Sequence, residues 1–142
     1  MIKIYKQELD KRAEKYTIYG ASTYSKASNQ FPTNSPGFIT HGKGCYVWSV
    51  DGKKYIDFTM GLRSNLLGHA DERILAPVRK QLELGSNFGL PSPIESELAE
   101  LICNTIPCAE KVGFAKNGSD ANNAAVKLAR IYTNRDIIAR CY

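Results

Sequence analysis

The chain has 142 residues, a length typical of about one domain, with 43% hydrophobic and 23% charged residues and a formal net charge of +5. Its lysines and arginines are scattered, which argues against a nucleic-acid-binding face, and no run approaches the roughly 20 apolar residues of a membrane span. The charged start of the chain lacks the apolar core of a signal peptide. We therefore expect a cytoplasmic protein that binds neither nucleic acid nor membrane.

Residues 2–16 have apolar side chains at helical spacing and predict a charged amphipathic helix. Residues 17–36 are rich in Ser, Thr, Asn and Pro, which is typical of an extended or looping segment. The next residues alternate apolar and polar side chains between turn signals, at 42–44 and at Asp51-Gly52. They predict a three-stranded antiparallel meander, with strands near 37–40, 45–50 and 53–58.

Two helices are predicted after the meander. Residues 71–84 have helical periodicity, and Gly85 suits the end of that helix. The second helix has Ser92 as its cap, Pro93 in its first turn, and Glu95 in the position of a capping-box acid. Its inner face carries leucines and isoleucines, and Pro107 ends it.

The last part of the chain predicts one βαβ unit. A strand at 111–115 leads into a helix at 119–133, and "DIIARC" follows as a second strand at 136–141. The predicted fold class is therefore α/β, with a small domain over residues 1–70 and the start of a large parallel-sheet domain over 71–142. Because two parallel strands cannot cover their own faces, we expect the opening of a larger fold.

Four cysteines and two histidines offer no metal chemistry by their spacing. The cysteines form no CxxC pair, and neither histidine has a metal-ligand neighbour at a typical interval. We predict no metal site, and reduced thiols that are mostly buried. The four cysteines are Cys45, Cys103, Cys108 and Cys141.

The corner Asn117-Gly118-Ser119-Asp120, between the first predicted strand and its helix, allows two interpretations. In the first, Asn117 caps the helix and Asp120 acts as the capping-box acid, with no ligand needed. In the second, free amides at the helix start and the Ser119 hydroxyl bind an anion that approaches over Gly118. No GxxxxGK[ST] or GxGxxG motif is present, so neither a nucleoside triphosphate nor a dinucleotide is indicated.

The same residues resemble a known family. "FAKNGSDANNAAVKLARIYTNRD" is similar to the phosphate-binding strand-turn-helix of class III pyridoxal-phosphate (PLP) aminotransferases, commonly F-x-N-[SG]-G-[ST]-[ED]-A. Other motifs follow the order found in the glutamate-1-semialdehyde 2,1-aminomutase branch of that family, and the resemblance covers about residues 31–141. These motifs are "GKGCYVWSVDGKKYIDF", "LGHA" and "GSNFGLPSPIESELAELI".

The resemblance implies a fold-type I PLP enzyme whose cofactor phosphate rests on Asn117, Gly118 and Ser119. Tyr142 is the candidate for the aromatic residue stacked on the pyridine ring. Lys116 departs from the usual Asn at its position. Its charge either assists the phosphate or is simply solvated at the end of a strand.

The segment "GLRSNLLGHA" matches the family's substrate-entrance loop, so Arg63, Ser64 and Asn65 are candidates for binding a small-molecule amino substrate. An arginine fork suits a carboxylate. The alternative is a solvent-exposed turn. Aminomutases usually carry an aromatic residue at Arg63 or Ser64, and this departure favours an aminotransferase for another substrate. His69 is expected to act in packing or at a helix start.

The resemblance also places the Schiff-base lysine and the acid that pairs with the pyridine nitrogen beyond residue 142. No catalytic residue is therefore assigned in this chain, which we expect to be inactive alone, and family members usually form homodimers. The alternatives are a class III aminotransferase for another amino acid or amino sugar, a non-catalytic fragment that acts through a partner chain, and a generic binder of phosphate metabolites.

Overall fold

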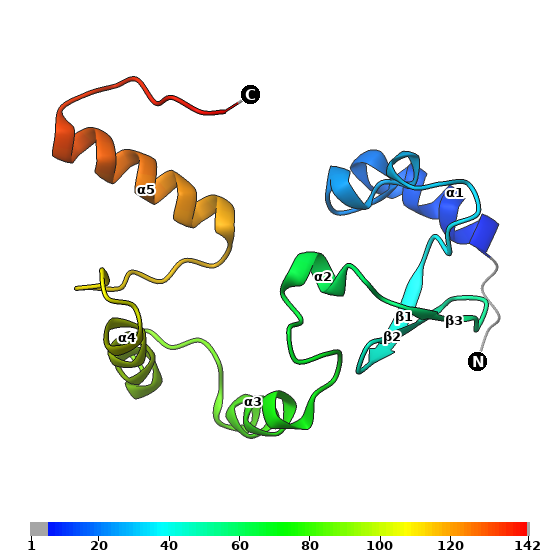
Figure 1. Ribbon diagram of the computed structural model, residues 1–142. Helices are drawn as coiled ribbons and strands as arrows, with labels where there is room; N and C mark the ends of the chain where they lie inside the picture. Colours follow the sequence, from blue (N-terminus) through cyan, green and yellow to red (C-terminus); the bar gives the residue numbers. More distant parts are fainter. Residues whose placement is uncertain (1–5, 142) are drawn as a thin grey trace. The chain divides into compact units, whose positions relative to one another are not determined.

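The computed structural model describes residues 6–141; residues 1–5 and 142 lie outside the described part. The chain divides into two compact units, Met1–Ser86 and Asn87–Tyr142, which are treated separately below (Figure 1). The predicted domain boundary between residues 70 and 71 stays a prediction.

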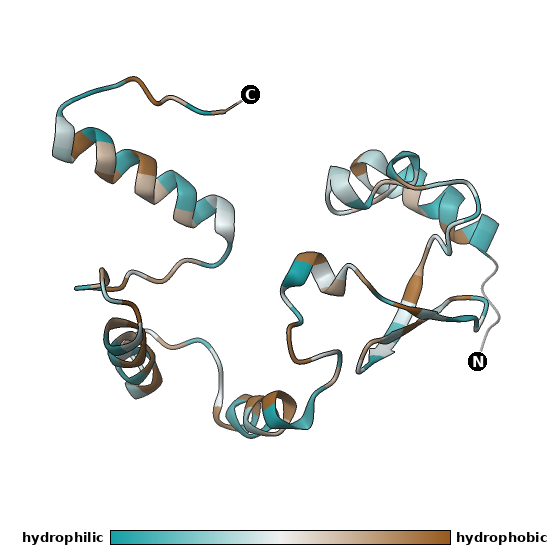
Figure 2. Ribbon diagram, viewed as in Figure 1, coloured by the Kyte–Doolittle hydropathy of each residue, from teal (hydrophilic) through white to brown (hydrophobic). Residues whose placement is uncertain are grey.

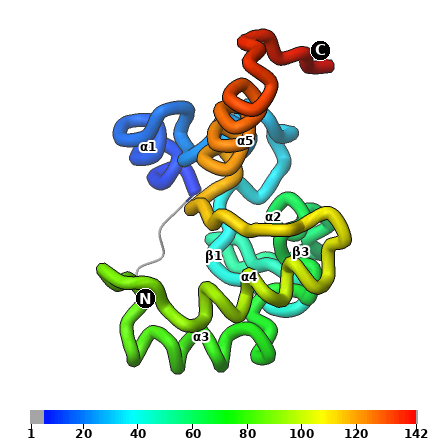
Figure 3. Tube along the Cα trace, turned by 90° about the vertical axis from the view of Figure 1, so that its left-hand side faces the viewer, coloured from blue at the N-terminus to red at the C-terminus, as the bar shows by residue number. Residues whose placement is uncertain are grey.

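The first unit opens on helix α1 (Lys6–Tyr16), which confirms the predicted N-terminal helix from residue 6 onward. The expected loop at 17–36 contains three short 3-10 helices, because consecutive turns close on i→i+3 hydrogen bonds such as Lys26 N to Thr23 O at 3.0 Å. The first of these contacts α1 (Figure 3). The three are η1 (Ile18–Gly20), η2 (Tyr24–Lys26) and η3 (Ser28–Gln30).

The predicted antiparallel meander is confirmed, with the strand order β1-β2-β3. Its strands are β1 (Ile39–Lys43), β2 (Tyr46–Ser49) and β3 (Lys54–Ile56). The first turn lies at Gly44, later than predicted, because Gly42 and Lys43 pair with β2. The second turn is at Asp51-Gly52 as predicted, and the φ of +82° at Gly52 is one that glycine adopts without strain.

The buried part of the first unit is small and centres on β2. Val47 and Ser49 are buried in this strand, and Ala27 is buried after η2. The Ser49 hydroxyl donates to the carboxylate of Asp51 and lies 3.2 Å from the Lys53 carbonyl oxygen, so this buried polar group has partners. The meander is therefore held by backbone pairing and local hydrogen bonds around a minimal core.

Helix α2 (Met60–Arg63) is a single turn after the meander, and α3 (Glu72–Leu84) follows it. The side chain of Asp71 caps α3 by accepting from Arg73 N at 2.9 Å. Gly85, with φ of +99°, follows the last helical residue. Both ends of the predicted helix at 71–84 are thus confirmed, since caps and breakers act locally.

The second unit contains α4 (Pro93–Thr105) and α5 (Gly118–Thr133). Ser92 N donates to the carboxylate of Glu95 at 3.4 Å, one half of the predicted capping box. Asn134 ends α5 in the left-handed conformation, with φ of 51°. Both predicted helices are confirmed.

The prediction of two strands, one on each side of α5, is wrong. Residues 111–115 and 136–141 form no strand, and β1, β2 and β3 are the only paired strands among residues 6–141. A strand is stabilised by hydrogen bonds to a neighbouring strand, and neither segment has such a neighbour in the described part of the chain. The βαβ unit of the predicted large domain is therefore not formed in this structure.

Helices α3, α4 and α5 carry apolar residues (Figure 2), and many of these side chains are exposed. On α4 the side chains of Leu98 and Leu101 are 45% and 61% exposed, and on α5 those of Leu128 and Ile131 are 67% and 79% exposed. The expectation of buried thiols is wrong for the same reason, because little of the chain is buried: three cysteines are exposed and Cys103 is half-buried. No helix in the part the structure describes is long and apolar enough to cross a membrane.

Candidate functional site

The corner before α5 is a capped helix start. Asn117 is the cap in extended conformation, and its Oδ1 accepts from Asp120 N at 3.0 Å. The Asn117 side-chain amide in turn donates to Asp120 Oδ2 at 2.9 Å. The capping interpretation is thereby confirmed, except that Asp120 accepts from the side chain of Asn117 and not from its backbone.

The same corner keeps donors free for a ligand. Gly118 N, Ser119 N and the Ser119 hydroxyl have no hydrogen-bond partner among residues 6–141. A Cβ built at Gly118 meets no atom within 4 Å, so the space over the helix start is open. Unpaired amides at the positive end of a helix dipole suit an anion such as a phosphate. Capping and anion binding are compatible here because they use different amides.

The charged residues that flank the corner in the sequence favour the binding of an anion. Lys116 is exposed and takes part in no ion pair among the described residues, which leaves its positive charge next to Asn117. The carboxylate of Asp120 accepts a hydrogen bond from the side-chain amide of Asn117. An incoming phosphate would therefore meet an unpaired cation and an acid already engaged by a donor.

The candidate entrance loop contains the short turn α2, whose backbone is left-handed. The φ values from Met60 to Arg63 are 44°, 61°, 58° and 73°. For residues other than glycine this conformation costs on the order of 1–2 kcal/mol each. Such strain persists only where surrounding contacts hold it, and it concentrates at functional sites.

Of the three predicted substrate residues, only Arg63 has a side chain without a hydrogen-bond partner among residues 6–141. The Ser64 hydroxyl donates to the Gly61 carbonyl oxygen at 2.8 Å, and the Asn65 side-chain nitrogen lies 3.3 Å from His69 Nδ1. The exposed guanidinium of Arg63 has no hydrogen bond or ion pair in the described part of the chain. Ser64 and Asn65 also line a cavity of about 260 Å³ beside the start of α3.

Asp57 is a residue of this loop that the sequence analysis missed. Its Oδ1 accepts from Thr59 N, the Thr59 hydroxyl and Met60 N at 3.0, 2.7 and 3.1 Å, and its Oδ2 lies 2.7 Å from His69 Nε2. The hydrogen bond from His69, aided by those from Thr59, lowers the pKa of Asp57 to about 2. Asp57 is the third residue of "YIDF" and directly follows β3, where the alternating pattern indicates only a strand end.

His69 is packed as expected, on the backbone of the meander. Gly44 N donates to His69 O and His69 N donates to Gly44 O, both at 2.8 Å. A Cβ at Gly42 would lie 2.6 Å from the His69 ring, so only glycine leaves room for it. The loop from Asp57 to His69 is thus closed against β1.

The predicted site residues do not all lie in the same unit of the chain. The corner lies in the second unit and the loop in the first, and each is described as its own site. Tyr142 lies outside the described residues. Within residues 6–141 no three His, Cys, Asp or Glu side chains gather as a metal site would require.

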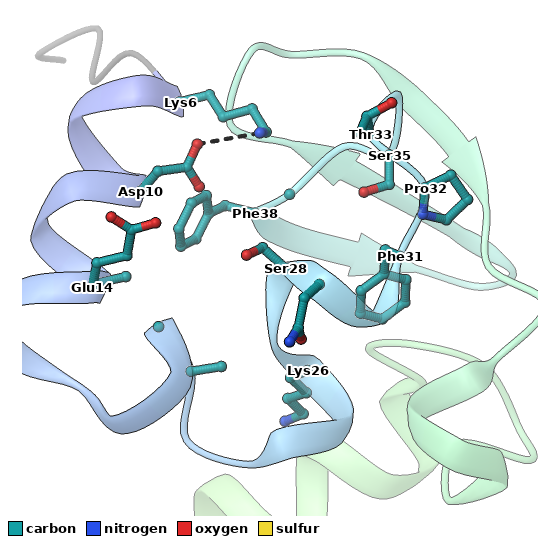
Figure 4. Close-up of a pocket in the computed structure, with 15 residues that line it drawn as sticks. Lys6, Asp10, Glu14, Lys26, Ser28, Phe31, Pro32, Thr33, Ser35 and Phe38 are labelled. Carbon is teal, nitrogen blue, oxygen red and sulfur yellow. Dashed lines mark hydrogen bonds and ion pairs between the residues drawn. The ribbon is translucent and has the colours of Figure 1, made fainter.

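A larger cavity of about 730 Å³ lies in the first unit, between α1 and residues 20–38 (Figure 4). Lys6 and Asp10 on its wall form an ion pair at 3.2 Å. Phe31 and Phe38 add apolar surface. None of the predicted site residues lines this cavity, so it is not part of the candidate site.

The sequence of this chain matches a known protein family. The family Aminotransferase class-III matches residues 27–141. A glutamate-1-semialdehyde 2,1-aminomutase of Methanococcus maripaludis is 37% identical over 134 residues, which cover 94% of this chain and 30% of that protein.

Solved structures show the same similarity. An omega-transaminase from Sphaerobacter thermophilus superposes with a TM-score of 0.87 at 31% identity, over 96% of this chain and 31% of that one. A transaminase solved with PLP bound gives a TM-score of 0.83 at 31% identity, over 95% and 31% of the two chains. The chain thus spans about a third of the length of the proteins it matches.

Proposed function

Because this chain belongs to the class III aminotransferases, we propose that it forms the cofactor-phosphate site and the substrate-entrance loop of a PLP-dependent aminotransferase or aminomutase. The free amides of Gly118 and Ser119 at the open start of α5 carry this proposal. Pyridoxal phosphate would supply an electron sink for amino-group transfer. The residues of this chain would bind and orient it.

At the corner, Gly118 N, Ser119 N and the Ser119 hydroxyl would donate to the phosphate oxygens. Hydrogen bonds to a charged acceptor contribute about 1.5–3 kcal/mol each, so two or three of them hold a dianion firmly. Asn117 would fix the geometry through its cap to Asp120, keeping the amides aimed outward. Fixed donors cost no reorganisation when the cofactor arrives.

In the entrance loop, Arg63 would bind the carboxylate of a small amino substrate through its two-pronged guanidinium. Its side chain is free for this role, whereas Ser64 and Asn65 are engaged in local contacts and would shape the loop. An aminomutase substrate and an amino-acid donor both carry a carboxylate. Carboxylate binding by Arg63 is therefore compatible with both intramolecular and intermolecular transfer.

The lysine that would attach the cofactor covalently is not assigned in this chain. None of its lysines stands in the sequence context of the family's cofactor lysine. We propose that the lysine and the acid facing the pyridine nitrogen come from the part of the family's architecture that this chain does not span, within a cytoplasmic homodimer. A second candidate, an aminotransferase for another amino acid or amino sugar, is favoured by Arg63 and Ser64 in place of the aromatic residue usual in aminomutases.

Equilibrium dialysis with pyridoxine 5′-phosphate tests the phosphate site, because this analogue lacks the aldehyde that reacts with surface lysines. The chain should bind it and should bind pyridoxine at least about tenfold more weakly, as expected for the loss of charge-assisted hydrogen bonds. Ser119→Ala should reduce the preference. Equal binding of both compounds would contradict the proposed function.

A further inference from the structure

We propose that His69 is a positioning residue: together with Asp57 and Asn65 it holds the turn from Met60 to Arg63 in the conformation that presents Arg63 to an anionic substrate. This inference rests on the proposed function, since the position of Arg63 matters only if its guanidinium meets a carboxylate. His69 itself would touch neither substrate nor cofactor.

The turn needs such support because its conformation is intrinsically unfavourable. All four residues of the turn have positive φ. Gly61 adopts such angles without strain, but Met60, Leu62 and Arg63 do not. A run of four left-handed residues does not persist by local preference. Contacts from outside the turn must therefore hold it.

The entry to the turn is held by Asp57. Three donors converge on its Oδ1, from the backbone of Thr59 and Met60 and from the Thr59 hydroxyl. Its Oδ2 is 2.7 Å from His69 Nε2, and the two side chains are 13% and 20% exposed. The imidazole thus fixes the orientation of the carboxylate that the entry of the turn depends on.

The exit of the turn is held by the other nitrogen of the same ring. The side-chain amide of Asn65 lies 3.3 Å from His69 Nδ1, and Asn65 N donates to Met60 O at 3.0 Å. The ring packs against Gly42, and the backbone of His69 pairs with that of Gly44. These contacts fix the position of the imidazole. One ring therefore ties both ends of a strained turn to the meander.

Two substitutions separate the two nitrogens of the ring. His69→Gln places an amide nitrogen near the position of Nε2 and can still donate to Asp57. His69→Asn is shorter, retains a polar group near Nδ1 and loses the contact with Asp57. If Asp57 must be oriented by His69, His69→Asn should release the turn and His69→Gln should largely preserve it.

The test uses the 142-residue chain labelled with ¹⁵N and titrated with glutarate, a dicarboxylate probe. In the unsubstituted chain and in His69→Gln, the Arg63 Nε–H resonance should shift saturably. In His69→Asn the midpoint should rise about fivefold, as expected if the turn is formed in about a fifth of the molecules. Hydrogen exchange at Met60 N should quicken in parallel, while Ser49 N, bonded to Lys53 O in the meander, should stay protected.

A glutarate midpoint that stays unchanged in His69→Asn would overturn the proposal, whether or not exchange at Met60 quickens. So would the absence of a saturable shift at Arg63 in the unsubstituted chain. If Ser49 N also loses protection in His69→Asn, the Asn65→Ala variant takes its place, and an unchanged midpoint there overturns the proposal equally. Binding of pyridoxine 5′-phosphate is followed at the amide resonances of Gly118 and Ser119. A failure of the phosphate site is therefore detected separately from a failure of the Arg63 turn.

Discussion

Replacing Asp57 by alanine should destabilise the first unit by roughly 2–4 kcal/mol, because three donors and the imidazole of His69 lose one shared acceptor. Trp48 in β2 is the only tryptophan and stacks on His41, so its fluorescence follows unfolding of the meander in urea. The midpoint of unfolding should fall clearly relative to the unsubstituted chain.

Asp57→Asn is the matched control for this prediction. Its side-chain oxygen can still accept from Thr59 and Met60, but it lacks the charge that pairs with His69. Its unfolding midpoint should lie between those of the unsubstituted chain and Asp57→Ala. A midpoint unchanged in Asp57→Ala would show that the loop is not held by this carboxylate.

The pH dependence of this contribution follows from the lowered pKa of Asp57. Its pKa is about 2 in the folded chain, below the ordinary value of 3.8, chiefly because His69 donates to the carboxylate. The stabilisation is therefore complete above pH 3.8 and is lost as the pH falls toward 2. The difference in unfolding midpoint between the unsubstituted chain and Asp57→Asn should shrink over that range. Asp71, whose pKa Arg73 also lowers to about 2, cancels in this difference.

Gly118→Ala should strengthen α5 and weaken phosphate binding. The backbone of Gly118 lies outside the left-handed region and its surroundings are open, so alanine fits and adds helix propensity of up to about 1 kcal/mol. The added methyl group would occupy the space through which a phosphate approaches the free amides. Affinity for pyridoxine 5′-phosphate should fall about tenfold, consistent with the loss of one charge-assisted hydrogen bond.

Gly113→Ala provides the control for this substitution, because Gly113 also has open surroundings and precedes Gly118 by five residues. It should leave the affinity for pyridoxine 5′-phosphate unchanged. Circular dichroism reports the helix content of both variants. Should Gly118→Ala add helix and leave the affinity as it was, the corner would be a helix cap and nothing more.

Features with a local cause were predictable from the sequence. The turn at Asp51-Gly52, the capping position of Ser92 before α4 and the end of α3 at Gly85 each depend on a few consecutive residues. The corner at Asn117 was recognised for the same reason, as a cap and as a possible anion site. Such signals survive whatever surrounds them.

Features that depend on distant partners were not predictable in this way. The strands expected at 111–115 and 136–141 need neighbours that residues 6–141 do not provide. The contact of Asp57 with His69 spans 12 residues, and His69 also pairs with the backbone of Gly44, which is 25 residues away in the sequence. No pattern of period two or 3.6 encodes such a contact.

The central claim is that the amides at the start of α5 bind the phosphate of the cofactor. Amide resonances of the ¹⁵N-labelled chain, titrated in parallel with pyridoxine 5′-phosphate and pyridoxine, test it most directly. The amides of Gly118 and Ser119 should show saturable shifts with the phosphorylated compound alone. Shifts of equal size with both compounds, or none at these two residues with either, would contradict it.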